Sequence, residues 1–416
     1  MRRLLILGGG TAGTMVANKL RRRLDGADWQ ITVVDHDDDH LYQPGLLWLP
    51  FGDIEPRQIV KPRQRFLPDG VDLVLGEIVR VDADANSVVL AGGRELGYDF
   101  LVIATGVSPR PDQTPGMLGG EWRRSIFDFY TLDGATALRP ALAAFDGGRL
   151  VVHITDMPIK CPVAPLEFTF LADAYFRARG MRDRVEIVYV TPLPGAFTKP
   201  IAAAHLGSML DDRKIVVEPD FMVERIDTDT KTLVSYDDRE VPFDLLVTVP
   251  LNMGAEFVAR SGLGDELNLV PVDKHTLLST RHANVFALGD ASNIPTSKAG
   301  SVAHFSVEVF ADNFCQHIAG LAMTGSFDGH ANCFVESGAG KGLLIDFNYD
   351  TEPLTGTYPL PIVGPFGLLT ESARNHWGKL AFRWIYWHLL LPGRRIPLPA
   401  AMSMAGKHLP VKEPPS

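Results

Sequence analysis

The stretch that decides the fold is Leu4-Leu5-Ile6-Leu7-Gly8-Gly9-Gly10-Thr11-Ala12-Gly13, near the start of the 416-residue chain. Its four apolar residues predict a buried parallel strand that runs into a G-x-G-x-x-G turn and then into the helical pattern of Met15, Val16 and Leu20. A second expected strand, 31–34, ends in Asp35, 22 residues after the last glycine. Strand, glycine turn, helix, strand and acid in this order predict a dinucleotide-binding site.

The glycines of this motif have separate physical tasks. Gly8 permits the tight turn, Gly10 lets a pyrophosphate approach the backbone, and Gly13 lets the helix pack closely on the strand. The helix N-terminus offers unpaired N–H groups and a positive dipole end to the phosphates. Asp35 is expected to accept hydrogen bonds from a ribose. The alternative is a glycine-rich turn that binds nothing.

Composition bounds the classes of protein that remain. The chain is 46% hydrophobic and 22% charged, and at about 150 residues per domain its length predicts two or three domains. Its 40 basic and 50 acidic side chains give a formal charge of −10, which argues against general nucleic-acid binding. Three cysteines are too few for a disulfide scaffold. No transmembrane helix or signal peptide is expected, because no apolar run is long enough for either.

Two later segments extend the first motif. Residues 98–106 predict a strand ending in Ala104-Thr105-Gly106, and residues 284–290 predict one ending in Gly289-Asp290. Over residues 1 to about 335, the three segments together resemble the two-dinucleotide-domain flavoproteins of the disulfide-reductase superfamily. The resemblance implies FAD, with Asp290 on the ribityl chain and flavin phosphate. The expected cofactor contacts are Gly8, Gly10, Thr11, Ala12, Gly13, Asp35, His36, Gln43, Ile78, Thr105, Gly106, Gly289, Asp290 and Lys298.

That superfamily normally carries a second glycine motif, for NAD(P)H, near the middle of the chain. The matching strand is expected at 149–154, but the segment after it reads Asp156-Met157-Pro158-Ile159-Lys160-Cys161-Pro162-Val163-Ala164-Pro165-Leu166-Glu167. Its prolines remove backbone donors, and no glycine permits close approach to a pyrophosphate. NAD(P)H binding at this position is therefore not expected.

The Cys-Pro-x-Ala-Pro-x-Glu pattern of 161–167 resembles the sulfide:quinone oxidoreductases and the flavoprotein subunits of flavocytochrome c sulfide dehydrogenases. In those enzymes two cysteines flank one face of the flavin and shuttle sulfur. The resemblance places this pair at Cys161 and Cys333, which are 172 residues apart, and a proton-transferring acid at Glu167. Sulfide is a soft nucleophile that attacks a disulfide or persulfide sulfur and generates a cysteine persulfide.

Each cysteine also has a structural interpretation. Cys161 and Cys333 can be small buried hydrophobes, and Cys315, on a helical pattern, is expected to fill the core. Some members of the family attach FAD to a third cysteine before the second domain, but residues 107–150 contain none. The FAD is therefore expected to be non-covalent, and no metal site is expected.

The C-terminal segment 371–391 predicts one helix with Leu380, Trp384, Trp387 and Leu391 on one face. The neighbouring charges are nearly all positive: Arg374, Lys379, Arg383, Arg394 and Arg395. An aromatic face with basic flanks is typical of a helix lying on anionic lipid, although packing on the core or in a dimer is the alternative. The stretch 376–382 resembles the family's quinone tunnel, which implies that Lys379 and Phe382 contact quinone.

The predicted fold class is α/β, with two Rossmann-like three-layer domains of the disulfide-reductase type and a C-terminal amphipathic helical region. We expect an FAD domain from 1–110 and 265–335, a second domain at 111–264 and a quinone and membrane region at 336–416.

The implied protein is an FAD-dependent oxidoreductase that transfers electrons from sulfide or a persulfide to ubiquinone or menaquinone. It is expected to be a peripheral, monotopic membrane protein facing the cytoplasm, and a homo-oligomer is compatible with the sequence. Three alternatives stay open: a type II NADH:quinone oxidoreductase, which needs the missing glycine loop, a flavocytochrome c-type sulfide dehydrogenase, and an FAD-binding sulfur-trafficking scaffold.

Overall fold

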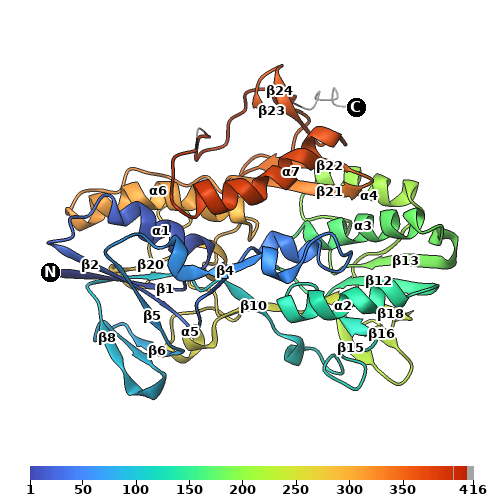
Figure 1. Ribbon diagram of the computed structural model, residues 1–416, viewed down its shortest axis with the longest axis horizontal. Coiled ribbons are helices and arrows are strands. Elements are labelled where there is room, and N and C mark those ends of the chain that lie inside the picture. The colour runs from blue at the N-terminus through green and yellow to red at the C-terminus, as the bar shows by residue number, and fades with distance from the viewer. Residues whose placement is uncertain (397, 410–416) are drawn as a thin grey trace.

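The computed structural model describes residues 1–396 and 398–409. Two α/β units lie side by side, and the C-terminal segment lies along one edge across both of them (Figure 1). The predicted α/β class, with parallel Rossmann-like sheets and a helical C-terminal region, is confirmed.

The N-terminal unit is built on a parallel five-stranded sheet in the order β20-β9-β1-β2-β5. Its strands are β1 (Arg2–Leu7), β2 (Trp29–Asp35), β5 (Val71–Leu75), β9 (Phe100–Ile103) and β20 (Val285–Ala287). Helices α1 (Thr11–Arg21) and α6 (Gly300–Ile318) pack together above it. An antiparallel sheet of β6 (Ile78–Asp82), β7 (Ser87–Leu90) and β8 (Glu95–Gly97) lies below, next to α5 (Glu256–Arg260). Because β20 comes from late in the chain and pairs with β9, this unit is discontinuous.

The second unit repeats the parallel design, with strand order β11-β18-β12-β13-β14. Its strands are β11 (Ile126–Phe127), β12 (Gly148–Ile154), β13 (Val185–Val190), β14 (Val216–Glu218) and β18 (Leu245–Val249), and its helices are α2 (Leu132–Ala144), α3 (Ala164–Ala178) and α4 (Pro200–Asp212). An antiparallel sheet contains β15 (Val223–Asp227), β16 (Thr232–Ser235) and β17 (Glu240–Pro242). The two chain crossings between the units, β10 (Val107–Pro109) and β19 (Asn252–Gly254), pair with each other.

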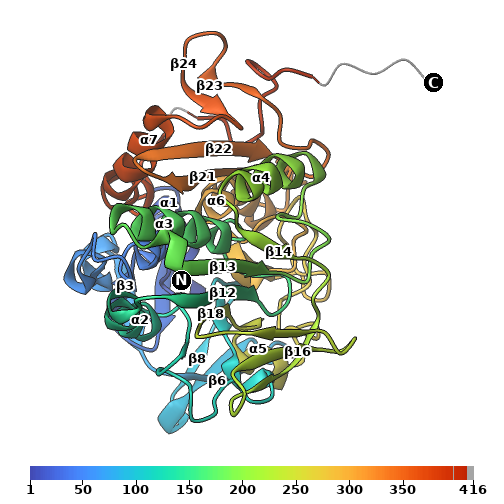
Figure 2. The ribbon, with the colours of Figure 1, turned by 90° about the vertical axis from the view of Figure 1, so that its right-hand side faces the viewer.

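The C-terminal region adds a four-stranded sheet and a helix. The strands are β21 (Ala331–Gly338), β22 (Lys341–Phe347), β23 (Gly356–Leu360) and β24 (Gly364–Leu368), in the order β21-β22-β24-β23. Helix α7 (Ala373–Ile385) follows, and the β23–β24 hairpin stands at the same outer edge as α7 (Figure 2). The boundary expected at 335/336 falls inside β21. A short pair, β3 (Asp39–Leu41) and β4 (Val60–Pro62), completes the strands.

The structure corrects the predicted single face of the C-terminal helix. Helix α7 continues into a π-helical turn at Tyr386–Leu390, and this turn changes the angular step between residues. Trp384, which precedes this turn, is exposed, whereas Trp387 within it and Leu391 after it are buried. Trp387 stacks on Phe66 of the N-terminal unit at 5.0 Å between ring centroids.

Lys379 also departs from its expected place among the surface charges, because its side chain is largely buried in an ion pair. Within residues 1–396 and 398–409, no helix combines the length and the apolar character needed to span a bilayer.

Candidate functional site

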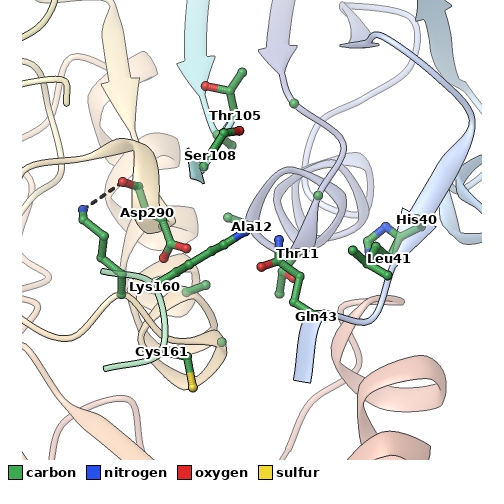
Figure 3. Close-up of a pocket in the computed structure, with 18 of the residues that line it drawn as sticks. Thr11, Ala12, His40, Leu41, Gln43, Thr105, Ser108, Lys160, Cys161 and Asp290 are labelled. Atoms are coloured by element: carbon green, nitrogen blue, oxygen red, sulfur yellow. Dashed lines mark hydrogen bonds between the residues drawn. The ribbon is translucent and has the colours of Figure 1, made fainter. Parts of the chain in front are cut away.

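A cavity of about 600 Å³ lies between the two units and the C-terminal helix, a volume typical of ligand sites. The predicted cofactor residues that line it are Gly8, Gly10, Thr11, Ala12, Asp35, His36, Gln43, Ile78, Thr105, Gly106, Gly289, Asp290 and Lys298. Cys161, Glu167, Lys379 and Phe382 line the same cavity. Figure 3 shows Asp290, Lys160 and Cys161 on one side of it and Thr11, Gln43 and His40 on the other.

The glycine turn after β1 has the geometry that its sequence predicts. Gly8 has φ +91°, a conformation that favours glycine. A Cβ on Gly13 would lie 1.8 Å from the carbonyl oxygen of Gly8, so α1 can approach the turn only with glycine there. A Cβ on Gly10 would meet nothing within 4 Å, which leaves its backbone open toward a ligand.

Asp35 at the end of β2 holds this turn in place. Its carboxylate accepts the N–H of Gly9 at 2.7 Å and pairs with Arg63 at 3.0 Å. His36 Nδ1 contacts Asp35 at 2.8 Å, and His36 Nε2 contacts Asp37 at 2.8 Å. These three side chains bring possible ligand atoms within 4.8 Å of one another, but they bind each other and Arg63, so we assign no metal to them.

Other polar groups around the cavity fit a phosphate-bearing cofactor such as FAD. The hydroxyl of Thr105 is buried without a hydrogen-bond partner in the described part of the chain, and burial raises the pKa of Asp290. Lys298 donates to the backbone oxygens of Asp290 and Ser292, both at 2.9 Å. Its amine therefore fixes the Gly-Asp turn, while the rest of the residue lines the cavity.

The loop between β12 and α3 presents Cys161 where a nicotinamide loop would begin. Cys161 has φ +49°, and its N–H donates to the carbonyl oxygen of Lys298 at 2.6 Å. The hydroxyl of Tyr130 donates to the Cys161 carbonyl at 3.2 Å. The loop is thus fixed to the N-terminal unit by one side and to the second unit by the other.

Cys333 lies in β21, opposite Ile345 of β22; it is buried and, unlike Cys161, is not among the residues that line the cavity. Burial raises the pKa of Cys161, and the charges of Glu167 and Cys333 raise it further, so the two thiols are within electrostatic range of each other. Burial likewise raises the pKa of Cys333 to about 12. All three cysteines are free thiols, and Cys315 packs partly buried against the core, as expected.

Glu167, in the first turn of α3, forms a buried ion pair with Lys379 of α7. The same carboxylate accepts the backbone N–H of Glu336 at 2.7 Å, and Lys379 also donates to the carbonyl of Phe334 at 3.3 Å. Burial raises the pKa of Glu167 against the opposing charge of Lys379. Burial lowers the pKa of Lys379, but Glu167 and Glu336 more than offset this effect and raise it overall.

Sequence reasoning missed several residues of this site. Lys160 lines the cavity beside Cys161, and its burial lowers its pKa. The hydroxyl of Tyr386 lies 2.8 Å from Thr11 Oγ1 and 2.7 Å from His40 Nε2, which closes the C-terminal turn over the glycine motif. Adjacency to Cys161 was a usable signal for Lys160. Nothing local marks Tyr386, because its partners are more than 340 residues away.

Comparison with known proteins shows which families and folds this chain resembles. The pyridine nucleotide-disulphide oxidoreductase family model matches residues 2–153. The mitochondrial sulfide:quinone oxidoreductase of Mus musculus is 26% identical over 93% of this chain and 89% of its own length. That of Schizosaccharomyces pombe is 28% identical over 84% of this chain and 82% of its own length. The sulfide:quinone oxidoreductase structure from Aquifex aeolicus shares the fold with a TM-score of 0.80 and 20% identity, covering 95% of this chain and 92% of that one.

The glycine turn yields a matched pair of substitutions. Gly13→Ala should destabilise even the FAD-free protein by at least about 2 kcal/mol, because the new methyl group overlaps the Gly8 carbonyl. Gly10→Ala should change that stability by less than about 1 kcal/mol. It should nevertheless weaken FAD binding about tenfold, since it fills the open approach to the backbone. Urea unfolding and FAD titration measure the two effects, and equal unfolding midpoints for the two variants would contradict this geometry.

The charge of Glu167 yields a second prediction. Glu167→Gln removes a negative charge that raises the pKa of Cys161 and leaves Lys379, which lowers it. Alkylation of Cys161 by iodoacetamide at neutral pH should then accelerate about tenfold for each unit by which the pKa falls. Lys379→Met should slow it. Peptide mass spectrometry resolves the sites, with Cys315 as the internal control; a Cys161 rate unchanged in both variants would refute the coupling.

Proposed function

Since the chain is a homologue of the sulfide:quinone oxidoreductases and an FAD-dependent oxidoreductase of that type, we propose that it oxidises sulfide or a persulfide at Cys161 and Cys333 and reduces a membrane quinone. One observation carries the proposal. The loop after β12 has no glycine, and it sets Cys161 into the wall of the cofactor cavity. A loop of this kind places a thiol at the cofactor cavity. It lacks the glycine backbone that would bind the pyrophosphate of NADH.

The cysteine chemistry conserves atoms and electrons. Hydrosulfide attacks a disulfide or persulfide sulfur held by the pair; the S–S bond breaks, one cysteine carries the persulfide and the other leaves as a thiolate. Re-forming an S–S bond between the persulfide and the thiolate releases two electrons and the proton that entered with HS⁻. Bound FAD supplies the two-electron acceptor between sulfur and quinone. In sum, HS⁻, a quinone and one proton give a quinol and one sulfur atom, which the protein retains as persulfide until an acceptor removes it.

Glu167 is the base that this chemistry requires. Both thiols have raised pKa values in the structure, so each must lose its proton before it can act as a thiolate nucleophile. Transfer of that proton to Glu167 removes the negative charge that disfavoured the thiolate, while the ammonium of Lys379 remains to stabilise it. Proton transfer from thiol to Glu167 is therefore less costly than loss of a proton to water.

The cofactor and acceptor sites divide the same cavity. FAD is held non-covalently along the glycine turn, Thr105 and Asp290, in a domain made of 1–110 and 265–335. Residues 111–264 supply Cys161 and Glu167 from the second domain. Phe382 offers an apolar ring and Lys379 an ammonium donor at the wall formed by α7, and we assign the ubiquinone or menaquinone ring to this wall.

The outer edge of the C-terminal region supports a peripheral membrane location. Trp377 and Trp384 on α7 are 67% and 59% exposed, and Ile362 at the tip of the β23–β24 hairpin is 94% exposed. Aromatic side chains beside exposed arginines suit the interface of an anionic membrane. The exposed arginines of this edge are Arg374, Arg383, Arg394 and Arg395.

The assignment predicts the response of the flavin. Under anaerobic conditions sulfide should bleach the flavin absorbance of the holoenzyme, NADH should not, and a short-chain quinone should restore it. Cys161→Ala and Cys333→Ala should each slow sulfide bleaching by at least about a hundredfold, because each removes a sulfur of the reacting pair. Cys315→Ala is the matched control and should bleach at the normal rate. Bleaching by NADH alone would overturn the assignment in favour of an NADH:quinone oxidoreductase.

The exposed tryptophans predict how the protein binds lipid. The double variant Trp377→Ser, Trp384→Ser should lose at least about tenfold in binding to vesicles that contain anionic phospholipid, since each indole contributes buried apolar area. Tyr236→Ser, at an exposed position of the second unit, is the control. Sedimentation with vesicles measures binding. Unchanged sedimentation of the double variant would refute the proposed membrane face.

A further inference from the structure

The buried ion pair of Glu167 and Lys379 continues toward the protein surface through two further side chains. His376 Nδ1 lies 2.9 Å from Glu336 Oε2, and the backbone N–H of Glu336 donates to Glu167 at 2.7 Å. His376 and Lys379 are three residues apart on α7 and so face the same way. One helix face thus carries both the imidazole that contacts the Glu336 carboxylate and the ammonium that pairs with Glu167.

These groups differ in their access to water. Glu167 and Lys379 line the cofactor cavity, whereas Glu336 and His376 do not. The side chain of Glu336 is only 1% exposed, while that of His376 is 18% exposed. A path from solvent to the cavity wall therefore begins at His376 and passes through the buried carboxylate of Glu336. It ends at the pair formed by Lys379 and Glu167.

One donor of Lys379 and one acceptor of Glu336 on this path are left without a hydrogen-bond partner among the described residues. An ammonium has three donors, and among the described residues Lys379 uses one on Glu167 and one on Phe334. Glu336 Oε1 is buried and has no hydrogen-bond partner in that part of the chain. The spare donor and the spare acceptor lie at the same stretch of β21, because Lys379 donates to Phe334 and its partner Glu167 accepts the N–H of Glu336.

The electrostatic setting of Glu336 favours proton exchange. Burial raises its pKa, and Glu167 on α3 raises it too, while Lys379 and His376 on α7 lower it. The residue opposite it on β22 is Gly342, which brings no charge. Glu336 therefore lies among an ammonium, an imidazole and a carboxylate, all of which can exchange protons with it.

We propose that His376 and Glu336 form a proton conduit from solvent to the Glu167–Lys379 pair, which supplies the proton consumed when quinone is reduced. The inference rests on the proposed function, because turnover of HS⁻ and quinone to sulfur and quinol takes up one proton. Lys379 gives a proton toward the cavity and regains one from Glu336. His376 then donates from Nδ1 to Glu336 and takes a proton from water. His376 and Glu336 are positioning residues, since neither touches the cavity.

The test separates the two half-reactions in the holoenzyme. His376→Ala and Glu336→Gln should leave the rate of sulfide bleaching within about twofold. Both should slow reoxidation of the flavin by a short-chain quinone at least about tenfold, most strongly at alkaline pH, because protons no longer reach the cavity wall. Added imidazole should restore reoxidation in His376→Ala. His388→Gln, an exposed histidine further along the same segment, should match the parent protein in both steps.

A spectroscopic measurement tests the protonation of Glu336 without turnover. Infrared difference spectra of the parent protein across a pH titration should contain a protonated carboxyl band that Glu336→Gln removes. Reoxidation that is unchanged in both variants over the pH range would overturn the conduit, as would equal slowing of both half-reactions without imidazole rescue. If the parent protein is not bleached by sulfide at all, the proposed function fails instead, so the two failures are distinguishable.

Discussion

The ion pair between Glu167 and Lys379 is the interaction on which the site depends. It joins α3 of the second unit to α7 of the C-terminal region, and it also fixes β21 through the N–H of Glu336. Burying two charges is costly unless they are paired, and removing one partner from such a pair costs about 3–5 kcal/mol. Three segments that are distant in the chain are therefore held at one point. Burial is the main cause of the raised pKa of both cysteines; Glu167 raises these pKa values further and Lys379 lowers them.

A second set of contacts makes the C-terminal segment part of the cofactor site. Tyr386 bonds to Thr11 and His40, and Asn18 of α1 donates to the carbonyl of Leu391 at 3.0 Å. The buried side of this segment covers the glycine motif, while its exposed side carries Trp377 and Trp384. Removal of the whole segment would open the cavity and also remove the exposed apolar side chains. Substitutions at single exposed positions therefore test membrane binding without disturbing the cofactor site.

The sequence was sufficient for the parts of the fold that local patterns encode. The apolar run at Leu4–Leu7, the glycine turn and the strand ending at Asp35 form as expected. The absence of glycine between 155 and 167 also predicted the unusual loop of Cys161. These features depend on neighbours in the chain, so their spacing is visible in the sequence.

Features that depend on tertiary contact were not visible. The π-helical turn at 386–390 moved Trp387 and Leu391 off the exposed face, because their packing against the N-terminal unit overrides helical periodicity. Lys379 was expected among the basic flanks of the helix and as a quinone contact, and only the fold sets it beside Glu167. No pattern in the sequence links Glu336 to His376, since their contact comes from the approach of α7 to β21.

The central claim is that sulfur chemistry at Cys161 and Cys333 occupies the place where relatives with a second glycine motif would bind a nicotinamide. The most direct measurement is the mass of each cysteine peptide after anaerobic treatment of the holoenzyme with sulfide and rapid alkylation. The account predicts one or more additional sulfur atoms on the Cys161 or Cys333 peptide and none on the Cys315 peptide. Bleaching of the flavin without added sulfur on either Cys161 or Cys333, or with sulfur on Cys315 alone, would contradict it.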